Sequence, residues 1–213
     1  KSKIKNINGT VHTLRKYDNR HLLKESELFF NWYLPLFLNK KKALNIKIKS
    51  KKILLKIFSQ LNFPNSCFVH KDYHSQNLIK IKKKIGIIDS QDALIGNLAY
   101  DLVSLIDDVR IKTPAKLKNQ IYSYYLEKNK KNLKSNTNIF FKDFNTLSVQ
   151  RSLKIIGIFS RLFKRDGKNR YLKFIPYAWK ILELRMKGKP FLEFKKILDQ
   201  NIPQNIRKKI IKK

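Results

Sequence analysis

The segment CFVHKDYHSQNLIKIKKKIGIIDSQD, residues 67–92, gathers side chains that can act in acid–base and metal chemistry. Asp72 stands two residues after His70, Asn77 five residues after Asp72, and Asp89 at the end of an isoleucine-rich run. A carboxylate can accept a proton from an attacking hydroxyl, and carboxylate and amide oxygens are ligands that Mg²⁺ prefers. This pattern therefore predicts a site that combines a general base with a divalent metal.

Acidic residues concentrate around this segment although the chain is strongly basic. Six of the 15 acidic residues lie between positions 72 and 108. Carboxylates repel one another, so their clustering in a lysine-rich chain favours a shared function. We expect Asp107 and Asp108, at the end of a helical pattern, to lie on a solvated helix face instead.

Two short strands are expected to bring Asn77 and Asp89 together. The runs LIKIK (78–82) and IGII (85–88) are separated by a tight lysine-rich turn, which is typical of a β-hairpin. A hairpin centred on Lys83 places Asn77 opposite Asp89. Directly paired residues have Cα atoms roughly 4.5–5.5 Å apart, so both oxygen ligands are expected at one end of the hairpin.

Helical patterns account for most of the remaining chain. Helices are predicted over 20–38, 43–61 (after an alternating start), 98–109, 114–128 (N-cap Thr113, N1 Pro114), 143–167 (C′ residue Gly167), 176–187 and 190–199. The stretch 129–138 reads as a polar loop, and the tail 206–213 as a basic helix or a frayed end. We predict a mainly α chain with a small central β-hairpin (α+β), forming a single lobe over residues 1–213.

The composition limits the classes of partner. The formal net charge is +33, and 39 of the 48 basic residues are lysine. Arginine is the residue preferred for reading bases and phosphates, so the lysine excess favours a solvated surface over a specific nucleic-acid site, with a polyanion-binding face as the alternative. A single cysteine is typical of a reducing compartment, and no apolar run approaches the ~18 residues of a membrane span. We therefore expect a cytoplasmic protein without a membrane partner.

A zinc site is the main alternative for the segment around the first strand. Cys67, His70 and His74 offer three ligands, but no fourth lies nearby in the sequence. A strand at this point directs Cys67 and Val69 to the same face as core residues. The pattern therefore disfavours zinc.

The motif His70-x-Asp72-x-x-x-x-Asn77 resembles the H-x-D-x-x-x-x-N catalytic loop of protein-kinase-like enzymes. The segments VHKDYHSQNLI and IGIIDSQDALIGNLAYDLVSL resemble the small-molecule branch, the aminoglycoside phosphotransferase-like kinases, with their IDF-x-D…G-x-x-x-YDLA signature. Within it the chain is most similar to the bacterial N-acetylmuramate/N-acetylglucosamine anomeric kinases of peptidoglycan recycling. The segments YDNRHLLKESELFFNWYL, IDSQDALIGNLAYDLVSLIDD and QRSLKIIGIFSRLFKRDGKNRYL carry this likeness and span most of residues 17–180.

The resemblance implies a role for each part of the motif within the C-terminal lobe of a protein-kinase-like fold. Asp72 would be the catalytic base, and Asn77 and Asp89 would bind Mg²⁺ or Mn²⁺. His70 would brace the loop, and Asp101, at the start of a helix beneath it, would hold the loop by hydrogen bonds. ATP would be the phosphoryl donor and the anomeric hydroxyl of an amino sugar the acceptor.

The resemblance also suggests where the acceptor binds. Residues 98–213 would form a helical, acceptor-side subdomain next to the catalytic loop and metal site of 67–92. The candidate substrate-binding residues are His74, Gln91, Asp92, Arg151 and Arg161. For His74 the alternative is a partly exposed loop histidine, and for Arg151 and Arg161 a core helix with solvated arginines. Ser90 replaces the aromatic residue usual in the family, which would loosen the packing under the metal site.

The N-terminal part of the sequence departs from the family pattern. These enzymes cover ATP with a glycine-rich loop and hold its phosphates with a lysine on a strand. Of the six glycines, only Gly9 precedes residue 86, and none forms G-x-G. We therefore expect the nucleotide-binding lobe to lie outside these residues, unless residues 1–19 are its last remnant. The chain would then be a fragment of a longer gene product, or a split or degenerate kinase. Two functions stay open, the catalytic lobe of a sugar kinase and a non-catalytic remnant or basic binding module.

Overall fold

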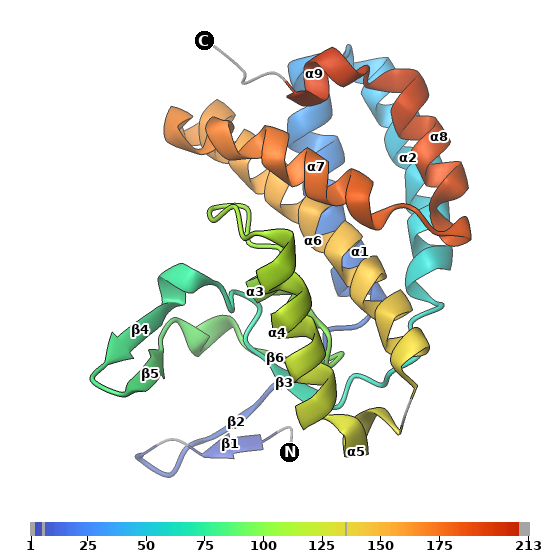
Figure 1. Ribbon diagram of the computed structural model, residues 1–213. Helices are drawn as coiled ribbons and strands as arrows, with labels where there is room; N and C mark the ends of the chain where they lie inside the picture. The colour runs from blue at the N-terminus through green and yellow to red at the C-terminus, as the bar shows by residue number, and fades with distance from the viewer. Residues whose placement is uncertain (1–2, 6, 135, 209–213) are drawn as a thin grey trace. The chain divides into compact units, whose positions relative to one another are not determined.

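The computed structural model describes residues 3–5, 7–134 and 136–208, and Figure 1 traces their helices and strands. The chain is mainly α with small antiparallel strand pairs, which confirms the predicted fold class. Backbone contacts divide it into two compact units. The first comprises Lys1–Asp18 and Asn62–Phe144, and the second Asn19–Leu61 and Asn145–Lys213. These boundaries differ from the subdivision at residues 67–92 and 98–213 that the sequence predicted.

The short strands of the first unit form two-stranded antiparallel sheets. The pairs are β1 (Lys3–Lys5) with β2 (Val11–Thr13), β3 (Cys67–Val69) with β6 (Leu94–Gly96), and β4 (Leu78–Ile81) with β5 (Lys84–Ile87). The backbone before the first helix runs beside β6, where Tyr17 N–H donates to Ile95 O over 2.7 Å. Gly96 permits this approach, because a Cβ there would lie 2.9 Å from a Val69 methyl and 3.2 Å from Tyr17 Cβ.

The β4–β5 hairpin forms as predicted, but its register is one residue away from the predicted one. The paired residues are Leu78 with Ile87, Ile79 with Gly86, Lys80 with Ile85, and Ile81 with Lys84. Lys82 and Lys83 therefore form a two-residue loop, with Lys82 in the left-handed region at φ 53°. Ile88 N–H donates to Asn77 O over 3.1 Å, so Asn77 faces Ile88 and not Asp89. Two-residue hairpin loops are usually marked by Gly or Asn, and this loop contains neither.

Helices complete the first unit. They are α3 (Tyr100–Ile106), α4 (Ala115–Lys128), α5 (Lys130–Leu133) and the beginning of α6 (Thr137–Asp166). Helix α5 lies in the stretch that was predicted to be a loop. Helix α4 begins at Ala115 with Pro114 as its N-cap, one residue later than predicted.

A buried carboxylate in α6 ties several segments of this unit together. Asp143 is 1% exposed and accepts hydrogen bonds from Asn97 Nδ2 at 2.8 Å and from the backbone N–H of Phe63 at 2.9 Å. It also accepts from Asn62 N–H at 3.0 Å. These bonds join the start of α6 to the chain just before β3 and just after β6, and so fix the base of the segment between those strands.

Among its described residues, the second unit consists of helices joined by short turns. It contains α1 (Asn19–Leu28), a π-helical turn (Phe29–Tyr33), a 3₁₀ turn (Leu34–Leu36), α2 (Lys40–Phe58), the rest of α6, a 3₁₀ segment (Asn169–Phe174), α7 (Ile175–Arg185), a 3₁₀ turn (Lys189–Phe191), α8 (Leu192–Asn201) and α9 (Gln204–Lys208). The alternating start of the predicted helix 43–61 forms no strand, because α2 is continuous and capped by Asn39. Residues 209–213 of the predicted tail lie outside the described residues.

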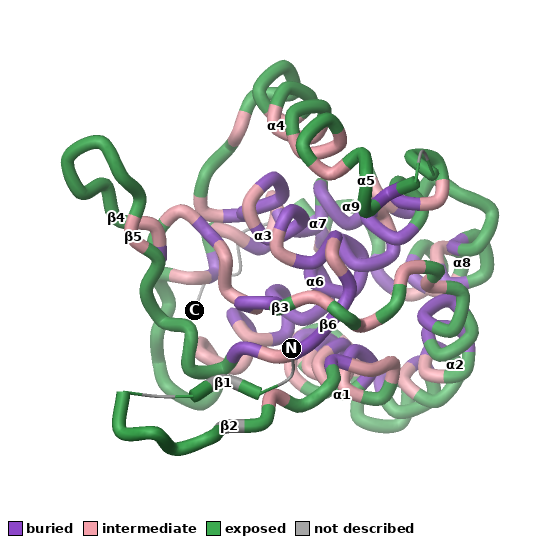
Figure 2. The backbone as a smooth tube through the Cα atoms, turned by 90° about the horizontal axis from the view of Figure 1, so that it is seen from below, coloured by how far each residue is buried: buried purple, intermediate pink, exposed green. Residues whose placement is uncertain are grey.

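Two packing features define the core of this unit. Gly157 on α6 meets α1 so closely that a Cβ would lie 2.3 Å from the carbonyl carbon of Leu28. Figure 2 shows this central part of α6 as largely buried. Elsewhere Arg207 stacks over Trp179, 4.9 Å from the ring centre, while Trp179 Nε1 donates to Tyr33 OH at 2.9 Å. Within the described residues, no helix is both long and apolar enough to cross a membrane.

Candidate active site

The pairing of β3 with β6 fixes both ends of the segment that carries the candidate site. Strand β3 leads directly into the loop that contains His70, Asp72 and Asn77, and β6 follows the turn that contains Asp89. The β4–β5 hairpin projects from between them and is largely exposed (Figure 2). The loop that begins at His70 and the turn at Asp89, some twenty positions apart in the sequence, are therefore held in one part of the first unit.

Helix α3 supports the loop through side chains on successive turns. Asp101, in the first turn, accepts the backbone N–H of His70 at 2.7 Å and that of Lys71 at 3.2 Å. Ser104, one turn later, donates to Lys71 O at 3.4 Å. Lys71 adopts φ 73°, a left-handed conformation that is costly for a residue with a Cβ. The bonds from Asp101 hold the backbone in this conformation, which directs the chain into Asp72.

The side chain of His70 connects the loop to the residue that follows the second strand of the hairpin. The ring is 3% exposed, and its Nε2 lies 2.9 Å from Ile88 O. A carbonyl oxygen only accepts, so Nε2–H is the donor in this bond. Because Ile88 immediately precedes Asp89, this bond fixes the position of the chain on which Asp89 follows.

Asn77 closes the loop onto Asp72. The Asn77 side chain is 8% exposed, and its Nδ2 donates to the backbone carbonyl of Asp72 at 2.9 Å. Its own N–H donates to His74 O at 2.9 Å. The amide oxygen is therefore the atom of Asn77 that can serve as a metal ligand. Asp72 is half-buried, so its carboxylate is placed by a rigid backbone and still reached by solvent.

Asp89 occupies a left-handed turn directly after the hairpin. Its φ is 67°, its side chain is exposed, and its Oδ1 accepts from Gln91 Nε2 at 3.4 Å. The sequence predicted that Asp89 would face Asn77. In the structure Ile88 faces Asn77, and Asp89 follows Ile88. Both side chains still belong to the same end of the hairpin.

The donor set fits a hard divalent cation. Mg²⁺ is usually bound by one or two protein oxygens and completes its shell with water and substrate phosphates. The Asn77 amide oxygen and the Asp89 carboxylate supply such a pair. In the part of the chain that the structure describes, no group of three or more His, Cys, Asp and Glu side chains is arranged to hold a metal. A dedicated cage of protein ligands is not what Mg²⁺ requires.

Asp107 and Asp108 are buried, which contradicts the solvated helix face that the sequence predicted. They are 3% and 2% exposed. Asp107 pairs with Lys118 Nζ at 2.8 Å, and Asp108 accepts from Ser75 Oγ at 3.0 Å. Helix α3 ends at Ile106, so the two carboxylates turn away from its solvent face. Asp108 thus holds the loop at Ser75, while Asp101 holds it at the other end of the same helix.

The remaining predicted residues differ in their surroundings. His74 is 6% exposed and so is not the partly exposed loop residue weighed as its alternative. Gln91 and Asp92 are exposed, in the 3₁₀ turn Ser90–Asp92. Arg151 and Arg161 lie on the part of α6 that belongs to the second unit, with Arg151 2% exposed and Arg161 half-buried.

The structure therefore brings together His70, Asp72, Asn77 and Asp101, with Asp89 adjoining, within the first unit. Sequence reasoning missed Ser75, Ser104 and Asp108. Only the excess of acidic residues between positions 72 and 108 signalled that more carboxylates belong to this region. Their partners lie about thirty residues away in the sequence, where local patterns give no sign of a contact.

Comparisons with known proteins place this loop in an enzyme family. Residues 10–133 match the phosphotransferase enzyme family, and this match includes every site residue of the first unit named above. The N-acetylmuramate/N-acetylglucosamine kinase of Pseudomonas aeruginosa is 33% identical over 195 residues, which cover 90% of this chain and 57% of the relative. The protein of that name from Neisseria meningitidis is 31% identical over 166 residues, covering 76% of this chain and 50% of the relative.

A further relative of the same name, from Caulobacter vibrioides, is 27% identical over 211 residues, or 97% of this chain and 57% of the relative. The chain spans about half the length of the curated relatives it matches. The family match covers more than half of the chain and includes the loop whose geometry is described above. The chain belongs to the phosphotransferase enzyme family.

Proposed function

We propose that this chain is the catalytic part of an ATP-dependent sugar kinase, which transfers the γ-phosphate to the anomeric hydroxyl of N-acetylmuramate or N-acetylglucosamine. The observation that carries the proposal is the loop from His70 to Asn77, held by Asp101 on one side and by the His70–Ile88 bond on the other. The names of the relatives support an amino sugar as acceptor. Cytoplasmic peptidoglycan recycling is the process that this substrate suggests.

Asp72 is proposed as the general base. The anomeric hydroxyl of a sugar is more acidic than an ordinary alcohol, which suits a carboxylate as proton acceptor. The half-buried position of Asp72 supports the role, because the residue stays partly accessible while its backbone carbonyl accepts from Asn77 Nδ2. Phosphoryl transfer depends mainly on positioning and charge neutralisation, so a rigid loop is the principal contribution of the protein.

Asn77 and Asp89 are proposed to hold Mg²⁺ or Mn²⁺ together with the phosphates of ATP. A bound divalent cation supplies charge neutralisation on the phosphoryl group. His70, Asp101 and Asp108 are positioning residues, because each acts on the loop backbone or on Ser75 and not on a substrate atom.

The candidate contacts to the acceptor sugar differ in how exposed they are. Gln91 and Asp92 are exposed next to Asp89, which favours them as direct contacts to the sugar. His74 and Arg151 are buried, which makes direct contact less favourable for them. Arg161 is half-buried and stays a candidate.

The nucleotide is proposed to need protein outside these residues as well. The chain spans about half the length of its relatives, and its sequence contains no G-x-G. We propose that protein outside these residues supplies the glycine-rich loop and the phosphate-binding lysine of kinases.

An assay of reducing ends tests the acceptor. Phosphorylation of the anomeric hydroxyl removes the reducing end of the sugar, whereas phosphorylation of another hydroxyl leaves it intact. The full product of the gene is incubated with ATP, Mg²⁺ and N-acetylmuramate or N-acetylglucosamine, and ADP and reducing ends are followed together. We expect one reducing end to be lost for each ADP formed. Reducing ends that persist while ADP accumulates would contradict the anomeric assignment.

A further inference from the structure

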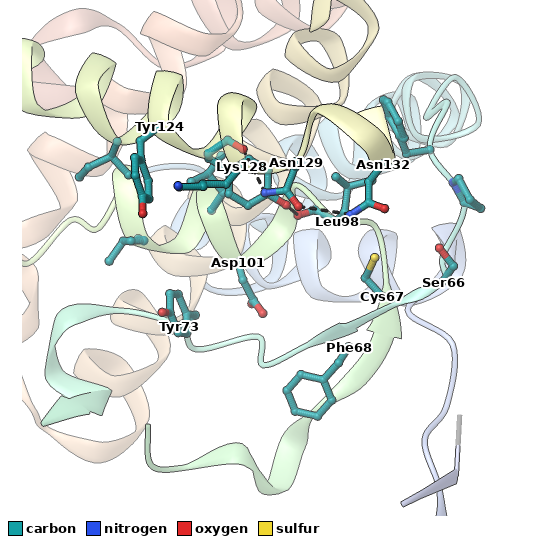
Figure 3. A pocket seen from close by; sticks show the side chains of 16 residues that line it. Ser66, Cys67, Phe68, Tyr73, Leu98, Asp101, Tyr124, Lys128, Asn129 and Asn132 are labelled. Atoms are coloured by element: carbon teal, nitrogen blue, oxygen red, sulfur yellow. Dashed lines mark hydrogen bonds between the residues drawn. The ribbon is translucent and has the colours of Figure 1, made fainter. Parts of the chain in front are cut away.

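A cavity of about 650 Å³ lies within the first unit, on the side of the catalytic loop that faces α3 and α4. Figure 3 shows its lining side chains. Its volume falls in the range of about 300–1,000 Å³ typical of small-molecule sites. The roles proposed above for the loop, the metal ligands and the acceptor contacts leave this cavity unassigned.

The walls of the cavity combine aromatic and aliphatic side chains. Phe63, Phe68, Tyr73, Tyr124 and Tyr125 contribute rings from four different segments of the chain. Burial, followed by the neighbouring Cys67 and Asp101, raises the pKa of Tyr125 to about 12. Its hydroxyl therefore stays protonated and donates to Leu98 O at 2.9 Å. These rings offer flat apolar surface without adding charge, which suits a planar aromatic ligand.

One edge of the cavity is polar and positively charged. Lys128, Asn129 and Asn132 form a row along the end of α4 and α5, with the Lys128 amine 5.4 Å from the ring centre of Tyr124 (Figure 3). The carboxylate of Asp101 also belongs to the lining, but it is turned towards the loop and accepts the N–H groups of His70 and Lys71. The charge available to a ligand is therefore that of the lysine.

Two lining residues connect the cavity to the catalytic loop. Tyr73 immediately follows Asp72, and Asp101 holds the loop backbone. A molecule that fills the cavity would contact both, and its binding free energy would then depend on the position of the loop. By thermodynamic reciprocity, the position of the loop then depends on whether the cavity is occupied.

We propose that this cavity is a regulatory site for a small planar aromatic molecule that carries one anionic group. The rings pack against the aromatic part, Lys128 binds the anion, and Asp101 and Tyr73 transmit occupancy to the catalytic loop.

The single cysteine of the chain provides a direct test, because Cys67 lines the cavity and its sulfur points towards Asn132 (Figure 3). The probe is naphthalene-1-sulfonate, a planar aromatic sulfonate. Alkylation of Cys67 by iodoacetamide is followed by mass spectrometry. At a probe concentration about ten times its dissociation constant, the cavity is empty in about one chain in ten. Alkylation of Cys67 should therefore slow about tenfold. An unchanged rate would overturn the proposal.

Three variants separate this cavity from other apolar surfaces. Lys128→Gln should weaken probe binding about tenfold, the effect of losing one hydrogen bond to a charged group. Lys116→Gln, an exposed lysine of the same helix outside the cavity, is the matched control and should bind as wild type. Ile121→Trp, which fills the cavity, should abolish both binding and protection of Cys67. Equal affinities for Lys128→Gln and wild type would refute the assigned anion contact.

Hydrogen exchange tests the connection to the loop independently of activity. Probe binding should change exchange in the peptide 67–77 and leave α8 unaffected. Unchanged exchange in 67–77 with the cavity occupied would overturn the regulatory role. Protection of Cys67 that grows with protein concentration, without probe, would identify a second copy of the chain as the occupant and would also contradict the proposal.

Discussion

The conformation of the loop from His70 to Asn77 depends on a few side chains that act on its backbone. Asp101 accepts N–H groups from two consecutive residues, and one of them, Lys71, is in the left-handed region at φ 73°. A single carboxylate thus compensates a local backbone cost and fixes the direction in which the chain enters Asp72. Backbone strain of this kind is found where the surrounding structure holds it in place.

Replacing Asp101 with Asn should therefore weaken the loop. The amide keeps one acceptor but turns its NH₂ group towards an N–H that has lost its partner. We expect the free energy of unfolding to fall by about 1–3 kcal/mol, the usual cost of an unsatisfied buried polar group. Urea titration measures this change. Asp92→Asn, at an exposed position, is the control, and an equal effect of both changes would disprove the role of Asp101.

Replacing Asp89 with Asn tests the metal site. Asn tolerates the left-handed conformation at φ 67° as well as Asp does, and the side chain is exposed, so stability should change little. The loss of a carboxylate should remove Mg²⁺ binding measured by calorimetry in the presence of ATP. Asp92→Asn again serves as control and should bind as wild type. Identical isotherms for wild type and Asp89→Asn would show that Asp89 is not a ligand.

At the scale of elements, α3 is the support of the site and α6 the centre of the helical unit. Helix α3 contacts the loop from Asp101, from Ser104 and from Asp108 just beyond its end. Helix α6 meets α1 at Gly157, where α1 gives way to the π-helical turn Phe29–Tyr33.

Gly157→Ala should be strongly destabilising. The new Cβ would lie 2.3 Å from Leu28 C and 2.5 Å from Phe29 N, and backbone atoms cannot move aside as a flexible side chain can. We expect a loss of about 1–3 kcal/mol or more, as for other overpacked positions. Gly188→Ala is the matched control, because its Cβ would come no closer than 3.5 Å to a neighbour. Thermal melting of both variants tests this, and equal midpoints would contradict the close packing.

The sequence predicted the type of most elements but not their exact pairing. Helical periodicity and end signals located most of the helices, but not α5, and the predicted helix 20–38 is α1 followed by a π-helical and a 3₁₀ turn. Gly167 ends α6 as expected, with φ 63° and a bond from Lys168 N–H to Leu162 O. The hairpin register was one residue off, because the loop residues Lys82 and Lys83 carry no turn signal. The partners of β3 and of Asp108 are distant in the sequence, so neither could be read from a local pattern.

The motif residues could be grouped from the sequence because their spacing is local. His70, Asp72 and Asn77 lie within eight positions, and a short loop with a following hairpin is enough to group them. The supports Ser75, Ser104 and Asp108 depend on how α3 packs against that loop, and the cavity depends on how α4 packs. Such contacts result from tertiary packing, which a single sequence does not encode in its periodicity.

For the whole molecule, the net charge of +33 is the dominant property. An excess of positive charge of this size attracts polyanions even without a specific binding site. Duplex DNA should therefore bind without sequence preference, and its affinity should fall about a thousandfold between about 50 and 200 mM salt. Fluorescence anisotropy with two unrelated duplexes measures both properties. A complex that prefers one sequence and survives physiological salt would favour the basic binding module over the kinase.

The most direct test of the central claim is phosphoryl transfer by the Asp72→Asn variant, followed by phosphorus NMR with ATP, Mg²⁺ and the amino sugar. The substitution keeps the size of the side chain and removes the base. With the full gene product, we expect the rate of sugar phosphate formation to fall at least about 100-fold. Asp166→Asn, an exposed carboxylate of the second unit, should react as wild type. A rate for Asp72→Asn equal to that of wild type would contradict the assignment of this loop as the catalytic site.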